Sequence, residues 1–238
     1  MKALLWYSFM TYMRNHHYVF PFVLIMMYSL FLYSTLSVFD TGGIFLVSLT
    51  ILFVTALLNG FFSNRIYSDD MRAIIVLKTG SAVKYYASNE VFFVILSAGY
   101  TILALVCPCV VCLFQTGQIN LHISACMLLI HLTVALFGYQ FGSFFRSYLT
   151  GRRKSAVLVM LVIILGMLLE QRLSVLPVIR HLLFVFPPVG RLFRLLYAGK
   201  GSFDVETGYV VIQLVIDTLI FLVGKMFILN RRKWAVYE

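Results

Sequence analysis

Charged side chains are scarce in this sequence of 238 residues: Asp, Glu, Lys and Arg make up 12% of it, about half the share found in soluble domains. Three segments contain none of them: residues 15–39, 41–64 and 91–145. A membrane-spanning helix needs roughly 20 apolar residues, so each of the first two segments is long enough for one span. The third has 55 residues, too many for one crossing, and must fold back near the polar cluster at 115–120. These gaps exclude a soluble fold and predict an all-α integral membrane protein.

Several catalytic motifs are absent as well. The phosphate-binding loop G-x-x-x-x-G-K-[ST] does not occur, and its closest partial match, "AGKGS" at 198–202, has glycine after the lysine and lacks the first glycine. The sequence has no H-E-x-x-H, no pair of acidic residues on a predicted span and no serine nucleophile elbow. We therefore expect that this chain is not an enzyme by itself and binds no cofactor.

Apolar segments separated by short polar ones predict six transmembrane helices in a single domain that covers residues 1–238. The spans are expected at about residues 18–39, 44–62, 91–114, 121–145, 156–169 and 209–229. Residues 1–17 predict an N-terminal interfacial helix, because Ser8, Thr11 and Asn15 fall on one side of it and apolar residues on the other. Such a helix lies along the membrane surface and does not cross it.

Residues 170–208, between spans five and six, do not fit a crossing. Their apolar pieces, such as "HLLFVFPPVG" at 181–190, are too short, and the pair Pro187-Pro188 would end any helix there because proline removes a backbone donor. We interpret this segment as short helices that enter the outer leaflet and return, which makes it a re-entrant outer segment.

The distribution of Lys and Arg sets the orientation. Six spans place both termini on one side of the membrane, together with the loops at 63–90 and 146–155. That side carries 14 of the 19 Lys and Arg residues, and the other side carries 5. The positive-inside rule therefore makes the side with both termini cytoplasmic. Orientation and anionic lipid headgroups account for the net charge of +10, and no nucleic-acid partner is expected.

The loop at 63–90 is unusually polar for this chain, with four basic and three acidic side chains. Ser-Asp-Asp at 68–70 favours a helix start, because these side chains cap free N–H groups and suit the positive end of the helix dipole. Gly80 suits the position just past a helix end. We predict a short cytoplasmic helix at 69–79, although an ordinary loop on lipid headgroups is the alternative. Its exposed residues are expected to include Ile74, Ile75 and Leu77.

The order of these elements resembles the membrane (permease) subunit of type 2 ABC exporters, a family that moves peptides, lipids, polysaccharides or drugs outward. The resemblance covers the whole chain and depends on architecture and on "SDDMRAIIVLKTGSAVKYYASNEV" at 68–91 more than on an invariant signature. It implies that 69–79 is the coupling helix, which fits a groove on a separate ATPase subunit, and that residues 1–17 brace the same partner. The docking residues implied are Asp69, Asp70, Met71, Arg72, Ile74, Ile75, Leu77 and Lys78.

The same resemblance implies the remaining partners. An ABC ATPase subunit dimer would bind ATP and Mg, and a second permease chain, identical or paralogous, would face this one across a transport path. The chain would lie in the bacterial cytoplasmic membrane and export hydrophobic or amphipathic cargo, such as a peptide, toxin, lipid or drug. A stable complex with an ATPase would distinguish an exporter from a membrane protein with a receptor or immunity role and no transport.

One acidic residue, Asp217, lies deep in a predicted span, and Gln213 precedes it by four residues on the same helix face. A carboxylate at this depth is costly in lipid and normally faces protein or water. Two roles remain open for the pair: a hydrogen bond between helices, or a place on the transport path.

The motif "CPCVVC" at 107–112 resembles the intramembrane motif of copper-pumping ATPases, and soft thiolates suit Cu(I). The rest of such a pump is absent, including a domain with a phosphorylatable aspartate. Small apolar packing, a disulfide near the outer face and a metal site are the open roles. The alternative function is thus a membrane protein with an intramembrane copper site. Its ligands would be Cys107, Cys109 and Cys112.

Overall fold

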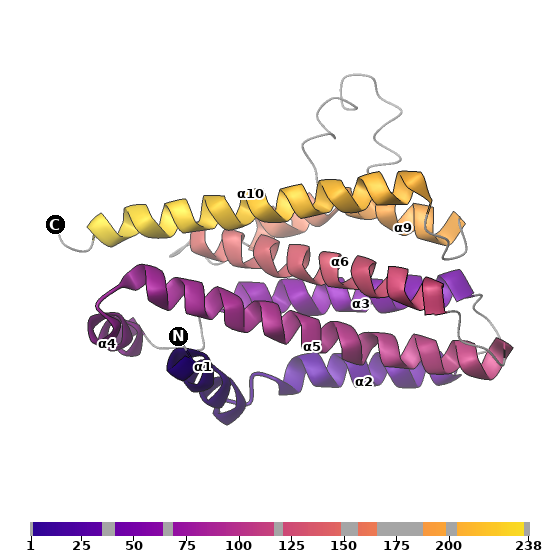
Figure 1. Cartoon of the computed structure of the whole chain (residues 1–238), viewed down its shortest axis with the longest axis horizontal. Helices are drawn as coiled ribbons and strands as arrows, with labels where there is room; N and C mark the ends of the chain where they lie inside the picture. Colours follow the sequence, from indigo (N-terminus) through magenta and orange to yellow (C-terminus); the bar gives the residue numbers. More distant parts are fainter. Residues whose placement is uncertain are drawn as a thin grey trace, which may run out of the picture.

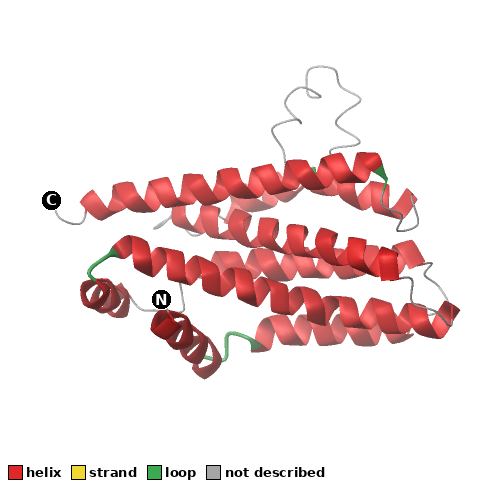
Figure 2. Ribbon diagram, viewed as in Figure 1, coloured by secondary structure: helices red, strands yellow, loops and turns green. Residues whose placement is uncertain are grey.

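The computed structural model describes most of the chain. The described residues are 2–34, 41–63, 69–116, 121–148, 157–165, 188–198 and 204–235. Nearly all of them are helical, and none of them forms a strand (Figure 2). The helices are α1 Lys2–Arg14, α2 Val19–Ser34, α3 Thr41–Phe62, α4 Asp69–Thr79, α5 Ala82–Thr116, α6 Leu121–Tyr148, α9 Val189–Ala198 and α10 Val205–Ala235. Residues 157–165 form a further helical segment.

Four of these helices, α3, α5, α6 and α10, are long and apolar enough to cross a membrane. Their membrane-spanning parts are Gly43–Phe62, Val83–Val110, Leu121–Phe145 and Val205–Ile228. The chain is therefore an all-α protein embedded in a membrane. The four helices coincide with the predicted second, third, fourth and sixth spans.

The other two predicted spans are only partly described. Val19–Phe31, within the predicted first span, is an apolar helix that is shorter than a typical crossing. The predicted fifth span at 156–169 is helical at 157–165, and its remaining residues lie outside the described part of the chain. The number of six spans therefore stays a prediction.

The predicted re-entrant segment at 170–208 contains α9, while residues 170–187 lie outside the described ranges. Helix α9 runs beside α10 at the end of the bundle opposite α4 (Figure 1). Leu192 and Leu196 of α9 are buried in the main hydrophobic core. On its other side, Arg191 donates a hydrogen bond to Glu206 at 2.9 Å, which ties α9 to the start of α10.

The helices lie side by side in one bundle, with α1 and α4 gathered at one end (Figure 1). The N-terminus and the C-terminal end of α10 lie toward this same end. Helix α1 packs against α5, and α4 also contacts α5, the helix that follows it in the chain. Figure 1 thus shows both predicted surface helices at the bundle end that carries the termini.

Helices α3 and α6 form the tightest pair in the bundle. A Cβ atom added to Gly60 would collide with the backbone carbonyl of Tyr139, and one added to Gly142 would collide with the carbonyl of Leu57. Gly142 also completes a G-x-x-x-G motif with Gly138, and this spacing lets membrane helices approach closely. Because only glycine leaves room for this contact, the positions of Gly60 and Gly142 determine where α3 and α6 cross.

A proline inside α5 leaves a backbone acceptor free, and α3 supplies the missing donor. Pro108 has no N–H, so the carbonyl of Ala104, one turn earlier, loses its helical partner. The hydroxyl of Ser48 donates to this carbonyl at 3.0 Å. Both groups are buried, where an unpaired carbonyl would be costly. The serine therefore compensates for the proline and links α3 to α5.

His131 of α6 extends this buried contact. Its Nδ1 lies 2.8 Å from the Met127 carbonyl, and its Nε2 lies 3.2 Å from the Ser48 hydroxyl. Because a carbonyl only accepts, Nδ1 carries hydrogen and Nε2 of the neutral ring is an acceptor. The single hydrogen of the Ser48 hydroxyl therefore serves either Nε2 or the Ala104 carbonyl at any one time. One polar chain thus connects α3, α5 and α6 in the middle of the bundle.

This compensation can be tested with a double-mutant cycle. We expect Ser48→Ala to lower the free energy of unfolding by about 1–3 kcal/mol, because the Ala104 carbonyl loses its donor. In a Pro108→Ala background the restored N–H can bond that carbonyl, so the same change should cost clearly less. Melting temperatures of the four detergent-solubilised variants measure both costs. Equal costs in the two backgrounds would refute the proposed compensation.

Candidate functional site

Helix α4 has the bounds predicted from the sequence, Asp69–Thr79. Its last turn is closed by the Thr79 hydroxyl, which donates to the Ile75 carbonyl at 2.9 Å. Gly80 follows with φ of 65°, a left-handed conformation that glycine adopts without strain. The hydroxyl of Ser81 then accepts a hydrogen bond from the Lys84 N–H at 3.4 Å in the first turn of α5. Only two residues separate the helices, so α4 is tightly tethered to α5.

The two faces of α4 have different surroundings. Leu77 is 75% exposed, and Met71 and Ile74 are each exposed by more than two fifths, so three apolar side chains point away from the bundle. Lys78 is exposed beside them. Asp69, Asp70 and Arg72 also belong to α4, but their side chains lie outside the described part of the structure.

Ile75 corrects the sequence prediction. It was expected to be exposed for docking, and the structure buries it to 9% exposure. The physical reason is that a short helix beside a bundle must cover one of its faces, and Ile75 lies on the face of α4 that contacts the bundle. Val76 is partly buried against the same neighbours. Ile75 therefore anchors α4 and is not available to a partner.

Ile75 is part of a group that we call the aromatic cluster. Its members are Tyr12, Ile75, Tyr85, Phe92, Phe93 and Tyr139. Phe93 stacks on Tyr139 with ring centroids 4.8 Å apart, and Tyr12 meets Phe92 edge to face at 5.7 Å. The cluster joins α1, α4, α5 and α6, so both surface helices are fixed to two membrane-spanning helices by one apolar contact region.

A buried ion pair lies directly beside the aromatic cluster. Lys225 of α10 has its Nζ 2.7 Å from Glu90 Oε1 of α5, and the lysine side chain is only 3% exposed. The ammonium also donates to Gln140 Oε1 at 3.0 Å and to Ser143 Oγ at 2.9 Å, both on α6. Its three hydrogens therefore all have acceptors.

Both carboxylate oxygens of Glu90 also accept hydrogen bonds from the protein. Gln140 Nε2 donates to Glu90 Oε2 at 3.0 Å, and the Tyr139 hydroxyl donates to Oε1 at 3.2 Å. The Lys225 Nζ lies 5.0 Å from the centre of the Tyr139 ring, a cation–π distance. The network thus connects α5, α6 and α10, and Tyr139 makes it continuous with the aromatic cluster.

This network links α5, α6 and α10 through fully hydrogen-bonded side chains. Every hydrogen of the ammonium is used, and both carboxylate oxygens accept protein donors. Sequence patterns alone do not indicate this network: Glu90 lies at the end of the polar loop at 63–90, and Lys225 lies near the end of the predicted sixth span. Opposite charges at the ends of two predicted spans were the available signal, but pairing between distant helices cannot be read from spacing.

The link makes a prediction about stability. Lys225→Met should lower the free energy of unfolding by about 3–5 kcal/mol, because Glu90 is left as an uncompensated buried charge. The double variant Glu90→Gln with Lys225→Met should recover much of that loss. Lys84→Met, at an exposed position of α5, is the matched control and should change stability little. Thermal melts in detergent compare them, and a Lys225→Met melt equal to that of the control would contradict the link.

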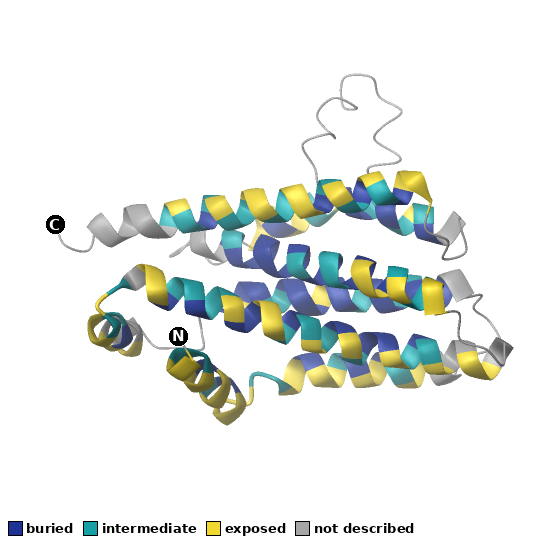
Figure 3. Cartoon of the chain, in the orientation of Figure 1, coloured by how far each residue is buried: buried dark blue, intermediate teal, exposed yellow. Residues whose placement is uncertain are grey.

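The predicted pair Gln213 and Asp217 lies on α10, the most exposed of the four spans. Only 11% of its membrane window is buried, against 39–61% for the other three, so much of its length faces outward (Figure 3). Both residues are half-buried. Asp217 Oδ2 is itself buried and has no hydrogen-bond partner among the described residues. No bond between helices is therefore seen for this oxygen within the described part of the chain.

Cys107 and Cys109 of "CPCVVC" contact different helices. The Cys107 thiol lies 3.8 Å from the Ser29 carbonyl of α2, and the Cys109 thiol lies 4.0 Å from the Ser124 hydroxyl of α6. Both thiols are free, and the described residues contain no group of three metal-binding side chains. Cys112 belongs to α5, but its side chain lies outside the described part. Cys107 and Cys109 therefore do not converge on one metal ion.

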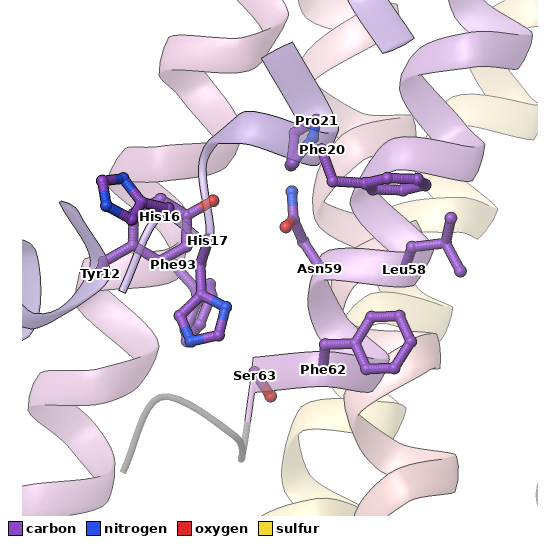
Figure 4. Close-up of a pocket in the computed structure, with 10 residues that line it drawn as sticks. All are labelled: Tyr12, His16, His17, Phe20, Pro21, Leu58, Asn59, Phe62, Ser63 and Phe93. Carbon is purple, nitrogen blue, oxygen red and sulfur yellow. The ribbon is translucent and has the colours of Figure 1, made fainter. Parts of the chain in front are cut away.

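A pocket of about 270 Å³ with a mostly apolar lining lies beside the turn between α1 and α2 (Figure 4). His16, with a positive φ of 55°, and His17 line it from the turn, and Asn59 and Ser63 line it from the end of α3. The Tyr12 side chain forms another wall, and burial raises the pKa of its phenol, which therefore stays protonated. The pocket thus combines a few polar side chains with a larger apolar surface from residues such as Leu58, Phe62 and Phe93.

The chain matches no family model, no curated protein and no solved structure. The features that bear on function are therefore those of the molecule itself: the exposed face of α4, the aromatic cluster, the buried network and the half-buried Asp217.

Proposed function

We propose that this chain is the permease subunit of an ATP-driven exporter of the type 2 ABC class. The observation that carries the proposal is the form of α4. It is a short helix at the bundle end that holds the termini, anchored by Ile75 and presenting Met71, Ile74 and Leu77 outward. An apolar face of this kind needs a partner, and a groove on a separate ATPase subunit suits it.

The division of labour follows from the sequence. The chain has no phosphate-binding loop, so in this proposal an ATPase subunit dimer holds ATP and Mg. Movement of the ATPase dimer would displace α4, and the short Gly80–Ser81 connection would pass that displacement to α5. The aromatic cluster and the pair of Glu90 with Lys225 offer a packed route onward to α6 and α10. Spatial continuity of this kind supports coupling, and double-mutant cycles measure it.

The transport path is proposed to lie along α10, between this chain and a second permease chain, identical or paralogous. Helix α10 leaves much of its length uncovered, and Gln213 and Asp217 are polar residues at its mid-span. Hydrophobic or amphipathic cargo suits such an apolar surface with few polar points. The distribution of Lys and Arg supports a cytoplasmic position for α1, α4 and both termini, in a bacterial plasma membrane.

The test is retention of an ATPase on the purified chain. We expect Ile74→Glu with Leu77→Glu to reduce the co-purifying P-loop ATPase about tenfold or more, because two apolar contacts are replaced by charge. Leu121→Glu, at an 81% exposed position on the opposite bundle end, is the matched control and should retain the ATPase. Mass spectrometry of mild-detergent preparations from native membranes gives the ratio of ATPase to permease.

Ile75→Glu separates docking from folding in the same experiment. Because Ile75 is part of the aromatic cluster, this change should lower the melting temperature, whereas the exposed pair should leave it nearly unchanged. An undiminished ATPase ratio in the Ile74→Glu, Leu77→Glu variant would show that α4 is not the docking helix.

A further inference from the structure

A second cavity, next to α1, is almost entirely apolar. It is a groove of about 620 Å³ between α1 and α5. Leu5, Trp6 and Phe9 line it from α1, and Ile95, Gly99 and Leu103 line it from α5. Lys2, at the start of α1, is the one charged residue in its lining.

The floor of the groove is apolar and hollow. A Cβ atom added to Gly99 would have no neighbour within 4 Å, so the space above this glycine is not filled by protein. Tyr12 and Tyr100 also line the groove, and their hydroxyl groups hydrogen-bond each other at 2.9 Å. One of the two phenol hydrogens is used in this bond, and these hydroxyl groups are polar side-chain groups on an otherwise apolar floor.

The walls of the groove carry exposed apolar side chains. Ile95 lies within the spanning part of α5 and is 59% exposed, and Trp6 on the opposite wall is 61% exposed. The groove therefore opens toward hydrocarbon, where an apolar hollow is filled by acyl chains. Lys2 places a positive charge at one end, and the first turn of α1 contains no acidic residue to offset it. An apolar slot with a single cation matches a lipid that has an anionic headgroup.

We propose that this groove binds an acyl chain of an anionic membrane phospholipid, with the phosphate of its headgroup beside Lys2. The site does not depend on the proposed export function, since it uses neither α4 nor a partner. It has a consequence for that function, however. Tyr12 lines the groove and belongs to the aromatic cluster with Ile75, so a lipid in the groove stabilises the same contact region that anchors α4.

The test uses Trp6 as a local reporter. The chain contains two tryptophans, and Trp234→Phe leaves Trp6 alone. The protein is placed in nanodiscs of phosphatidylcholine that contain a minor fraction of lipid with brominated acyl chains. In one sample the brominated lipid is phosphatidylglycerol, and in the other it is phosphatidylcholine. One nearby lysine should enrich the anionic lipid about fivefold at the site. Brominated phosphatidylglycerol should therefore quench Trp6 clearly more than brominated phosphatidylcholine at the same mole fraction.

Two substitutions should each remove the difference in Trp6 quenching between the two brominated lipids, for different physical reasons. Gly99→Leu fills the hollow, and Lys2→Gln removes the charge without touching the floor. Gly99→Ala is the matched control for Gly99→Leu, because one methyl group fits the open space and should preserve the difference. Lys2→Gln keeps the test decisive if Gly99→Leu lowers stability.

Three results would overturn the proposal. The first is equal quenching by the two brominated lipids in the parent protein. The second is stronger quenching of Trp6 by brominated phosphatidylglycerol that persists in both the Gly99→Leu and the Lys2→Gln variants. The third is a change of oligomeric state in Gly99→Leu without a change in quenching, which would mean that a second copy of the chain occupies the groove.

Discussion

The ion pair between Glu90 and Lys225 is the interaction on which the arrangement of the spans depends. Lys225 belongs to α10, the least buried of the four spanning helices, and its ammonium needs acceptors that lipid cannot supply. Those acceptors come from α5 and α6, so α10 has one position in which its lysine is fully hydrogen-bonded. Buried ion pairs add little net stability over apolar packing. We infer that this one specifies where α10 lies.

Two kinds of contact hold the bundle together. Helices α3 and α6 come into direct backbone contact at Gly60 and Gly142, and Phe53 stacks on Phe137 between the same two helices. On the side of α5 that carries α1 and α4, the aromatic cluster makes the contacts, and its rings lead to the ion pair through Tyr139. A displacement of α4 therefore meets packed residues from Ile75 to Lys225. This continuity supports the proposed coupling role of α4.

The sequence predicted what depends on local patterns. Charge-free segments located α3, α5 and α6, three of the four helices long enough to cross a membrane, and Ser-Asp-Asp followed by Gly80 located α4. The burial of Ile75 was predicted wrongly, because an isolated short helix gives no sign of which face its neighbours cover. The partnership of Glu90 with Lys225 and that of Ser48 with the carbonyl freed by Pro108 were missed for a related reason: each joins helices far apart in the chain. The G-x-x-x-G at 138–142 was a readable signal for close helix packing.

Photo-crosslinking from α4 in native membranes tests the central claim most directly. A photoreactive amino acid in place of Leu77 would report what covers the exposed face, and the same amino acid in place of Leu121 would report on the opposite bundle end. The account predicts a crosslink from position 77 to an ATPase with a phosphate-binding loop, and none to that ATPase from position 121. Crosslinks from position 77 to lipid alone, in cells that make the whole complex, would contradict it.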